Sequence, residues 1–162
     1  MSDVATAIKD FAPAVAWVVA AMGWLVANSQ ANKREVRKEV RGEIDEISKL
    51  GKEILSELKK YYKTSVTSDE SQQTEMVIKA HFKELDLRFD RLHCRQLSAF
   101  PSGGTVPAND AREKFFDLAT FKHFETSSRP TGVELSTLVL RQTHANLVLT
   151  EALHTQFLQE FR

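Results

Sequence analysis

Two acidic residues and a histidine form the sequence's best candidate for chemistry. Asp86, Asp90 and His93 follow the spacing i, i+4 and i+7, which places their side chains on one face of a helix. Carboxylate and imidazole groups in such an arrangement can hold a divalent metal ion. Arg88 and Arg91 are interleaved with them, so the sequence favours a surface network of ion pairs over a metal site.

The single cysteine, the glycine-rich loop and one basic run carry weaker signals. A nucleophilic cysteine needs an activating base, whereas the neighbours of Cys94, His93 and Arg95, point to other faces of the same predicted helix. The sequence PSGGT lacks the lysine and the glycine spacing that cradle phosphate groups. The run KKYYK is short and precedes acidic residues, which argues against nucleic-acid binding. We therefore expect no enzyme and no cofactor, metal, small-molecule substrate or nucleic-acid partner.

The composition of the chain indicates that helices position the candidate residues named above. The 162 residues suit one domain with an appendage. The 22 basic and 22 acidic residues balance, and the six glycines and four prolines are few enough for a largely helical chain. We predict an all-α fold: an N-terminal single transmembrane helix that continues into a cytoplasmic coiled coil or helical hairpin, followed by a small helical C-terminal subdomain.

An uncharged apolar run begins at Phe11 and predicts the transmembrane helix at residues 11–28. Phe11 to Ala27 rises about 25 Å as a helix, close to the ~30 Å hydrocarbon core of a bilayer. A cleaved signal peptide is disfavoured because Asp3 and Asp10 make the leader acidic. A buried core helix is the other alternative, but it needs more apolar surface around it than the remaining helices offer. Residues 1–10 would then be a short extracytoplasmic tail.

Basic residues on one side of this run predict its orientation. Only Lys9 precedes it, whereas five juxtamembrane basic residues follow it: Lys33, Arg34, Arg37, Lys38 and Arg41. The positive-inside rule then places the N-terminus outside and the C-terminal region in the cytoplasm. We therefore expect a single-pass protein of the inner (cytoplasmic) membrane, with the lipid bilayer as its first partner.

Small residues recur on one stripe of the predicted span and suggest self-association within the membrane. Ala16, Ala20, Gly23 and Ala27 are spaced 4, 3 and 4. Small side chains let two helix backbones approach closely in lipid. The alternative is that alanine is simply common in spanning helices. The first interpretation predicts a homo-oligomer.

Two heptad-patterned helices are predicted at residues 29–63 and 69–99. Each carries apolar residues at alternating steps of 4 and 3, the pattern of a coiled-coil seam. Gly51 interrupts the first seam, which leaves either a gap or a close helix crossing. Pairing within one chain, as a hairpin, and pairing between chains both remain open. The seam residues are Val40, Ile44, Ile47, Ile54, Leu58, Tyr61, Ile78, Phe82, Leu85, Phe89 and Leu92.

Residues 100–110 form the clearest linker, with two prolines and two glycines, and residues 111–162 would be the C-terminal subdomain. The segment VELSTLVL alternates partly like a strand, but its continuity with the following run favours one long helix. Apolar residues of this run fall on more than one helical face, as expected of a helix contacted on two sides.

Association surfaces dominate the informative features of the sequence. We therefore expect a non-enzymatic single-pass membrane protein whose cytoplasmic helical module self-associates or recruits a cytosolic protein partner to the membrane. One alternative is a membrane-perturbing, pore- or toxin-like effector subunit controlled by its cytoplasmic helical domain. A second alternative is a soluble helical protein in which the apolar helix is buried.

Overall fold

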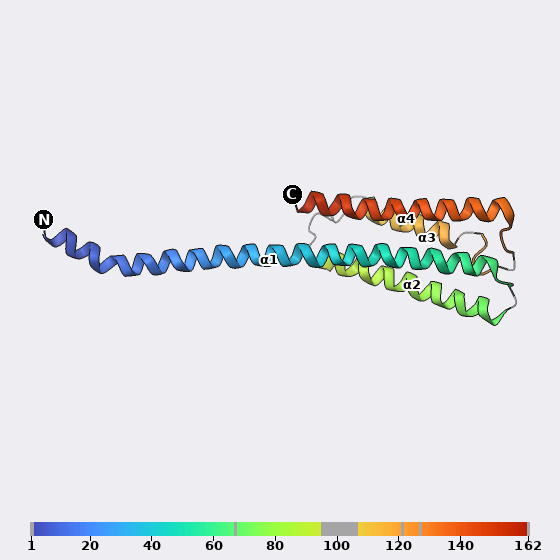
Figure 1. The fold of residues 1–162 in the computed structure, drawn as a ribbon, viewed down its shortest axis with the longest axis horizontal. Helices are drawn as coiled ribbons and strands as arrows, with labels where there is room; N and C mark the ends of the chain where they lie inside the picture. Colours follow the sequence, from blue (N-terminus) through green and yellow to red (C-terminus); the bar gives the residue numbers. More distant parts are fainter. Residues whose placement is uncertain (1, 67, 95–106, 121, 127, 162) are drawn as a thin grey trace. The chain divides into compact units, whose positions relative to one another are not determined.

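The computed structural model describes the backbone of residues 2–66, 68–94, 107–120, 122–126 and 128–161, and within these ranges the side chains from Ala16 onward except 93, 94 and 107. Four helices make up this part of the chain (Figure 1): α1 (Ser2–Lys63), α2 (Asp69–Cys94), α3 (Pro107–Thr120) and α4 (Gly132–Glu160). No strand occurs among the described residues. The all-helical prediction is therefore confirmed for them, including the ambiguous final segment.

The chain divides into two compact units, Met1–Glu39 and Val40–Arg162. In the second unit, α1 from Val40 onward packs with α2, α3 and α4 as a helical bundle (Figure 1). The expected separate subdomain at 111–162 is not found, because Phe115 and Leu149 belong to the same core as α1 and α2. Of the predicted linker, residues 100–106 lie outside the described part, and 107–110 form the first turn of α3.

Both predicted seams form the inside of this bundle. All eleven seam residues are at most 6% exposed within the single chain. Steps of 4 and 3 keep them on one side of α1 and of α2, and this side is where the other helices pack. Of the two arrangements that the sequence left open, the structure therefore uses the seams for packing within one chain.

Charged side chains form ion pairs along the edge of the α1–α2 contact. Arg88 on α2 lies with Nη1 3.2 Å from Glu43 Oε1 on α1 and with Nη2 2.8 Å from Glu84 Oε1 on its own helix. Its side chain is only 18% exposed, so water screens these pairs less than it screens pairs on the open surface. They form part of the ion-pair network that the interleaved arginines predicted.

Side chains from α1 and α4 cap the C-terminal end of α3. The last carbonyls of a helix have no partner within it. Here the Tyr62 hydroxyl donates to the Ala119 carbonyl at 3.0 Å, and Gln142 Nε2 donates to the Leu118 carbonyl at 3.0 Å. Burial raises the pKa of the Tyr62 phenol, so this group stays protonated at neutral pH and can donate. The bundle thus satisfies the polar end of α3 from its own interior.

Gly51 marks a close crossing of α1 and α4. Gly51 is buried, and a Cβ atom placed there would fall well inside van der Waals contact of Asn146 Oδ1. Asn146 is itself only 4% exposed, so its amide has little room to move. Of the two interpretations of Gly51 on the seam, the structure therefore shows the crossing and not a gap.

Gly51→Ala is expected to lower the free energy of unfolding by about 1–3 kcal/mol, because overpacking outweighs the gain of up to ~1 kcal/mol in helix propensity. Gly42→Ala is the matched control on the same helix, since nothing lies within 4 Å of its added Cβ, and it should stabilise. Urea unfolding followed by circular dichroism measures both. Adding Asn146→Ala should recover most of the loss at Gly51; equal stabilisation at both glycines would contradict the crossing.

Candidate functional site

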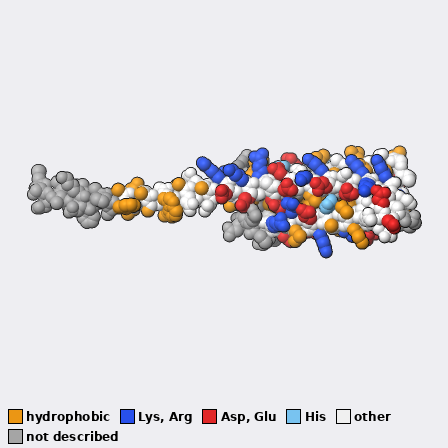
Figure 2. All heavy atoms as spheres, turned by 60° about the horizontal axis from the view of Figure 1, so that its bottom comes forward, with side chains coloured by type: hydrophobic (Ala, Val, Ile, Leu, Met, Phe, Trp, Pro, Cys, Tyr) orange, Lys and Arg blue, Asp and Glu red, His pale blue; other side chains and the backbone are white. Residues whose placement is uncertain are grey.

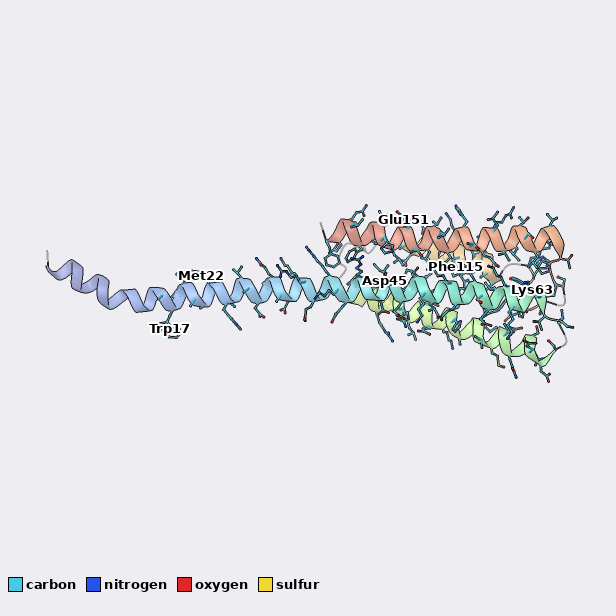
Figure 3. All side chains as sticks on the ribbon, in the orientation of Figure 1. Trp17, Met22, Asp45, Lys63, Phe115 and Glu151 are labelled. Atoms are coloured by element: carbon cyan, nitrogen blue, oxygen red, sulfur yellow. The ribbon has the colours of Figure 1, made fainter. Side chains whose placement is uncertain are left out.

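The apolar part of α1 is the first candidate site. Seven large apolar side chains are each more than half exposed: Trp17, Val18, Val19, Met22, Trp24, Leu25 and Val26. The predicted association residues Ala16, Ala20, Gly23 and Ala27 occupy the remaining side of the helix and are exposed too. Figure 3 shows Trp17 projecting away from the helix, and Figure 2 shows hydrophobic side chains along this segment. Residues 16–27 of α1 therefore have no charged side chain, and other parts of the chain bury none of their side chains.

The predicted transmembrane helix is only partly within the described residues. Where side chains are described, no helix has an apolar stretch that meets the length and hydropathy required to cross a membrane. Residues 11–15 of the predicted span lie outside that part of the chain, as does the predicted tail at residues 1–10.

Basic residues follow the apolar segment on the same helix. The predicted juxtamembrane residues Lys33, Arg34, Arg37, Lys38 and Arg41 are all exposed on α1, and basic side chains are visible there in Figure 2. Exposed Lys and Arg side chains next to a bilayer are attracted to anionic headgroups by about 1 kcal/mol each. The charged segment is thus placed directly after the apolar one along α1.

A polar cluster between α3 and α4 is the second candidate site. The His123 ring is only 6% exposed, with Nε2 3.0 Å from Glu134 Oε1 and Nδ1 3.2 Å from Ser128 Oγ. Lys122 Nζ lies 3.3 Å from the same oxygen of Glu134. Beside the cluster opens a pocket of about 430 Å³, lined by Leu118, Lys122, His123, Glu134, Thr137, Leu138 and Arg141.

Ser128, His123 and Glu134 are hydrogen-bonded in a row. The same three types of side chain form the catalytic triad of serine hydrolases, which also use an oxyanion hole. Here the Thr126 hydroxyl lies 3.4 Å from Ser128 Oγ and donates to the Ser128 carbonyl at 3.2 Å. Lys122 and Glu125 adopt left-handed backbone conformations, with φ of 51° and 58°. These bonds hold together a turn that contains two residues with left-handed backbone.

Glu134 should make this turn sensitive to acid. The hydrogen bond from His123, and a second from Lys122, hold the pKa of the Glu134 carboxyl below its usual range. A carboxyl with a lowered folded-state pKa contributes stability above its unfolded-state pKa, and that contribution is lost as the pH falls through the folded-state value. Glu134→Gln is therefore expected to lower Tm at neutral pH and to match the parent well below pH ~4.

Thermal unfolding across pH measures this difference. Glu113→Gln, at an exposed glutamate of α3, is the control and should leave the profile unchanged. A deficit of Glu134→Gln that is as large in acid as at neutral pH would contradict the role of the charge.

Arg129 ties the same turn to the bundle. Its Nη2 donates to Ser71 Oγ on α2 at 2.8 Å, and its Nη1 donates to the carbonyls of His123 and Thr126 at 3.3 and 3.2 Å. The guanidinium carbon lies 3.9 Å from the centre of the Tyr61 ring. Only the planar fork of arginine makes this set of contacts at once.

Arg129→Ala is expected to lower the free energy of unfolding by about 2–4 kcal/mol, because it removes charge-assisted hydrogen bonds and the contact with the ring. Arg129→Lys keeps the charge but loses the fork, and most of the loss should remain. Chemical denaturation measures both variants. Full stability of the lysine variant would show that charge alone holds the turn.

Of the residues first considered for chemistry, Asp86 is paired with an arginine and Asp90 is exposed. Asp86 lies 3.3 Å from Arg112 Nη1, and the described residues contain no group of three His, Cys, Asp or Glu side chains placed to hold a metal. Tyr61 and Tyr62 of the KKYYK run are buried and cannot stack on bases. The side chains of His93 and Cys94 and the PSGGT loop lie outside the described residues.

Comparison with known protein families, curated proteins and solved structures gives no match. A functional proposal for this protein therefore has to rest on its own sequence and structure. The cluster of His123, Ser128, Arg129 and Glu134 was not identified from the sequence. Its one local signal is the break TSSRPTG between two helical runs, which predicts a turn but not which polar groups the turn brings together.

Proposed function

We propose that this protein is a non-enzymatic membrane-anchored module that works through association. Residues 11–28 of α1 enter the cytoplasmic membrane, with the N-terminus outside, and the bundle of residues 40–162 lies on the cytoplasmic side. There the bundle associates with a second copy or with a cytosolic partner protein.

The observation that carries this proposal is the exposed apolar part of α1. Burying a large apolar side chain stabilises by about 1.5–3 kcal/mol, and seven such side chains remain exposed between Trp17 and Val26. A helix that is apolar on every side needs an apolar environment around it. The bundle has a core of its own, built from buried residues of all four helices without this segment, so lipid is the environment that we propose.

The orientation and the mode of action rest on two further features. The exposed basic residues after the apolar segment favour the cytoplasmic side of a membrane. Of the residues considered for chemistry, Asp86 is paired with Arg112, and the polar groups around His123 are bonded within the turn and to the bundle. This bonding favours association over chemistry as the role of the bundle.

Cell fractionation followed by alkaline carbonate extraction tests the anchor. The full chain should remain in the membrane pellet, and protease added from the cytoplasmic side should digest the bundle. Release of the full chain into the carbonate supernatant as a monomer would refute the proposal. Protection of the bundle from cytoplasmic protease would refute the orientation.

A further inference from the structure

The pocket between the end of α3 and the start of α4 combines charged and apolar side chains. Its α4 wall carries Glu134, Leu138 and Arg141, which are spaced 4 and 3 and therefore share one side of that helix. Leu118, near the end of α3, adds a second leucine, and both leucines are partly buried against the core. The volume of about 430 Å³ falls within the range of roughly 300–1,000 Å³ that is typical of small-molecule sites.

The charges that line this pocket do not cancel. An ionised carboxylate only accepts hydrogen bonds, so Glu134 Oε1 accepts from Lys122 Nζ at 3.3 Å and from His123 Nε2 at 3.0 Å. The glutamate and the lysine thus neutralise each other. Arg141 is exposed and forms no ion pair or hydrogen bond with any residue that the structure describes. One positive charge at the pocket is therefore left without a counter-charge among these residues.

The other described polar groups of the pocket wall are already engaged. The Thr137 hydroxyl donates to the Val133 carbonyl of its own helix at 2.8 Å. Both nitrogens of the His123 ring have partners, because Nε2 binds Glu134 and Nδ1 lies 3.2 Å from Ser128 Oγ. The guanidinium of the arginine and the two leucine side chains are thus what this wall offers to a ligand.

We propose that this pocket binds a small organic monocarboxylate with an apolar body. A guanidinium pairs with a carboxylate through two parallel hydrogen bonds, which assigns the anionic group to Arg141. The apolar body covers Leu118 and Leu138 and removes them from water. A single anionic group is specified because Lys122 already serves Glu134. Since the remaining polar groups are engaged, the ligand is bound and not converted, which fits a non-enzymatic module.

This inference goes beyond the membrane anchor and does not depend on it. The lining residues lie between Leu118 and Arg141, within the compact unit Val40–Arg162. A chain that is retained in the membrane can be measured in phosphatidylcholine nanodiscs, and a chain released by carbonate can be measured in buffer. Failure of the anchor and failure of the pocket are therefore seen in separate experiments.

Fluorine NMR of para-fluorophenylacetate, titrated with the full chain, tests the site against a blank without protein. Wild type should broaden the probe resonance in a saturable manner, and Arg141→Gln should weaken binding at least about tenfold. Lys114→Gln is the matched control, because Lys114 is an exposed cation on α3 that does not line the pocket, and it should bind like wild type. Absence of saturable binding to wild type, or equal weakening in the two variants, would overturn the inference.

Two further probes separate the contributions of charge and apolar body on the unmodified chain. Para-fluorophenylacetamide keeps the ring but has no charge, and acetate keeps the charge but has no apolar body. Each should bind wild type at least about tenfold more weakly than para-fluorophenylacetate. An amide that binds as tightly would overturn the pairing with Arg141, and acetate that binds as tightly would overturn the role of the leucines. Since Arg141 is exposed, Arg141→Gln should keep the Tm of wild type.

Discussion

Phe115→Ala is expected to lower the free energy of unfolding of the bundle by about 3–5 kcal/mol. Phe115 is fully buried on α3, and its ring centre lies 5.8 Å from that of Phe82 on α2. Figure 3 shows it inside the bundle, whereas Glu151 points outward from α4. Truncation leaves a cavity in the core where α3 packs against α2. A domain with a total stability of roughly 5–15 kcal/mol loses a large fraction of it.

The neighbouring residue provides the control. Phe116 is 47% exposed and contacts Phe82 only edge-on, with ring centres 5.1 Å apart. Phe116→Ala should cost about 1 kcal/mol. Guanidinium unfolding monitored at the helical circular-dichroism band measures both variants. Similar losses at the two positions would mean that α3 is not docked into the core by its Phe115 face.

Lysine at two positions of the apolar segment should abolish membrane binding. Each lysine near the centre of a spanning helix costs about 2.5–3.5 kcal/mol, so Val19→Lys with Met22→Lys should reduce partitioning by more than about a thousandfold. Both residues are more than half exposed in the chain, so the bundle should keep its stability. Flotation of the full chain with lipid vesicles measures the bound fraction.

The matched control places the same two charges on exposed apolar residues elsewhere. Val36 and Met76 are 39% and 71% exposed and lie outside the apolar segment. Val36→Lys with Met76→Lys should float with the vesicles as wild type does. Equal loss of flotation in both double variants would show that added charge, and not the apolar segment, controls binding.

Periodicity predicted the helices and the inside of the bundle well. The 4 and 3 steps from Val40 to Tyr61 and from Ile78 to Leu92 mark the faces that are buried, because a helix of 3.6 residues per turn returns each such residue to one side. The polar residues after Lys63 likewise predicted the break between α1 and α2, where Ser68 accepts a hydrogen bond from the Ser71 amide at 3.1 Å.

Periodicity does not say which helix a face will meet. The apolar face of α3 fits a separate subdomain and a shared core equally well, and only the packing of Phe115 against Phe82 distinguishes them. For the same reason, periodicity could not predict contacts between residues that are far apart in the sequence. Arg129 reaches Ser71, 58 residues earlier in the chain, and no spacing rule connects a turn arginine with a serine at the start of another helix.

Tryptophan fluorescence of the unmodified chain tests the membrane anchor most directly. The protein has two tryptophans, Trp17 and Trp24, and both are exposed on the apolar part of α1. No label is needed, because all tryptophan emission comes from the proposed anchor.

On adding vesicles, we predict that the emission shifts to the blue, resists quenching by aqueous iodide, and is quenched by brominated acyl chains. In a spanning helix Trp17 should lie deeper than Trp24, so the chain that keeps only Trp17, made by Trp24→Phe, should be quenched more strongly by bromine near the bilayer centre than the chain that keeps only Trp24. Emission that stays red-shifted and open to iodide in the presence of vesicles would contradict the anchor.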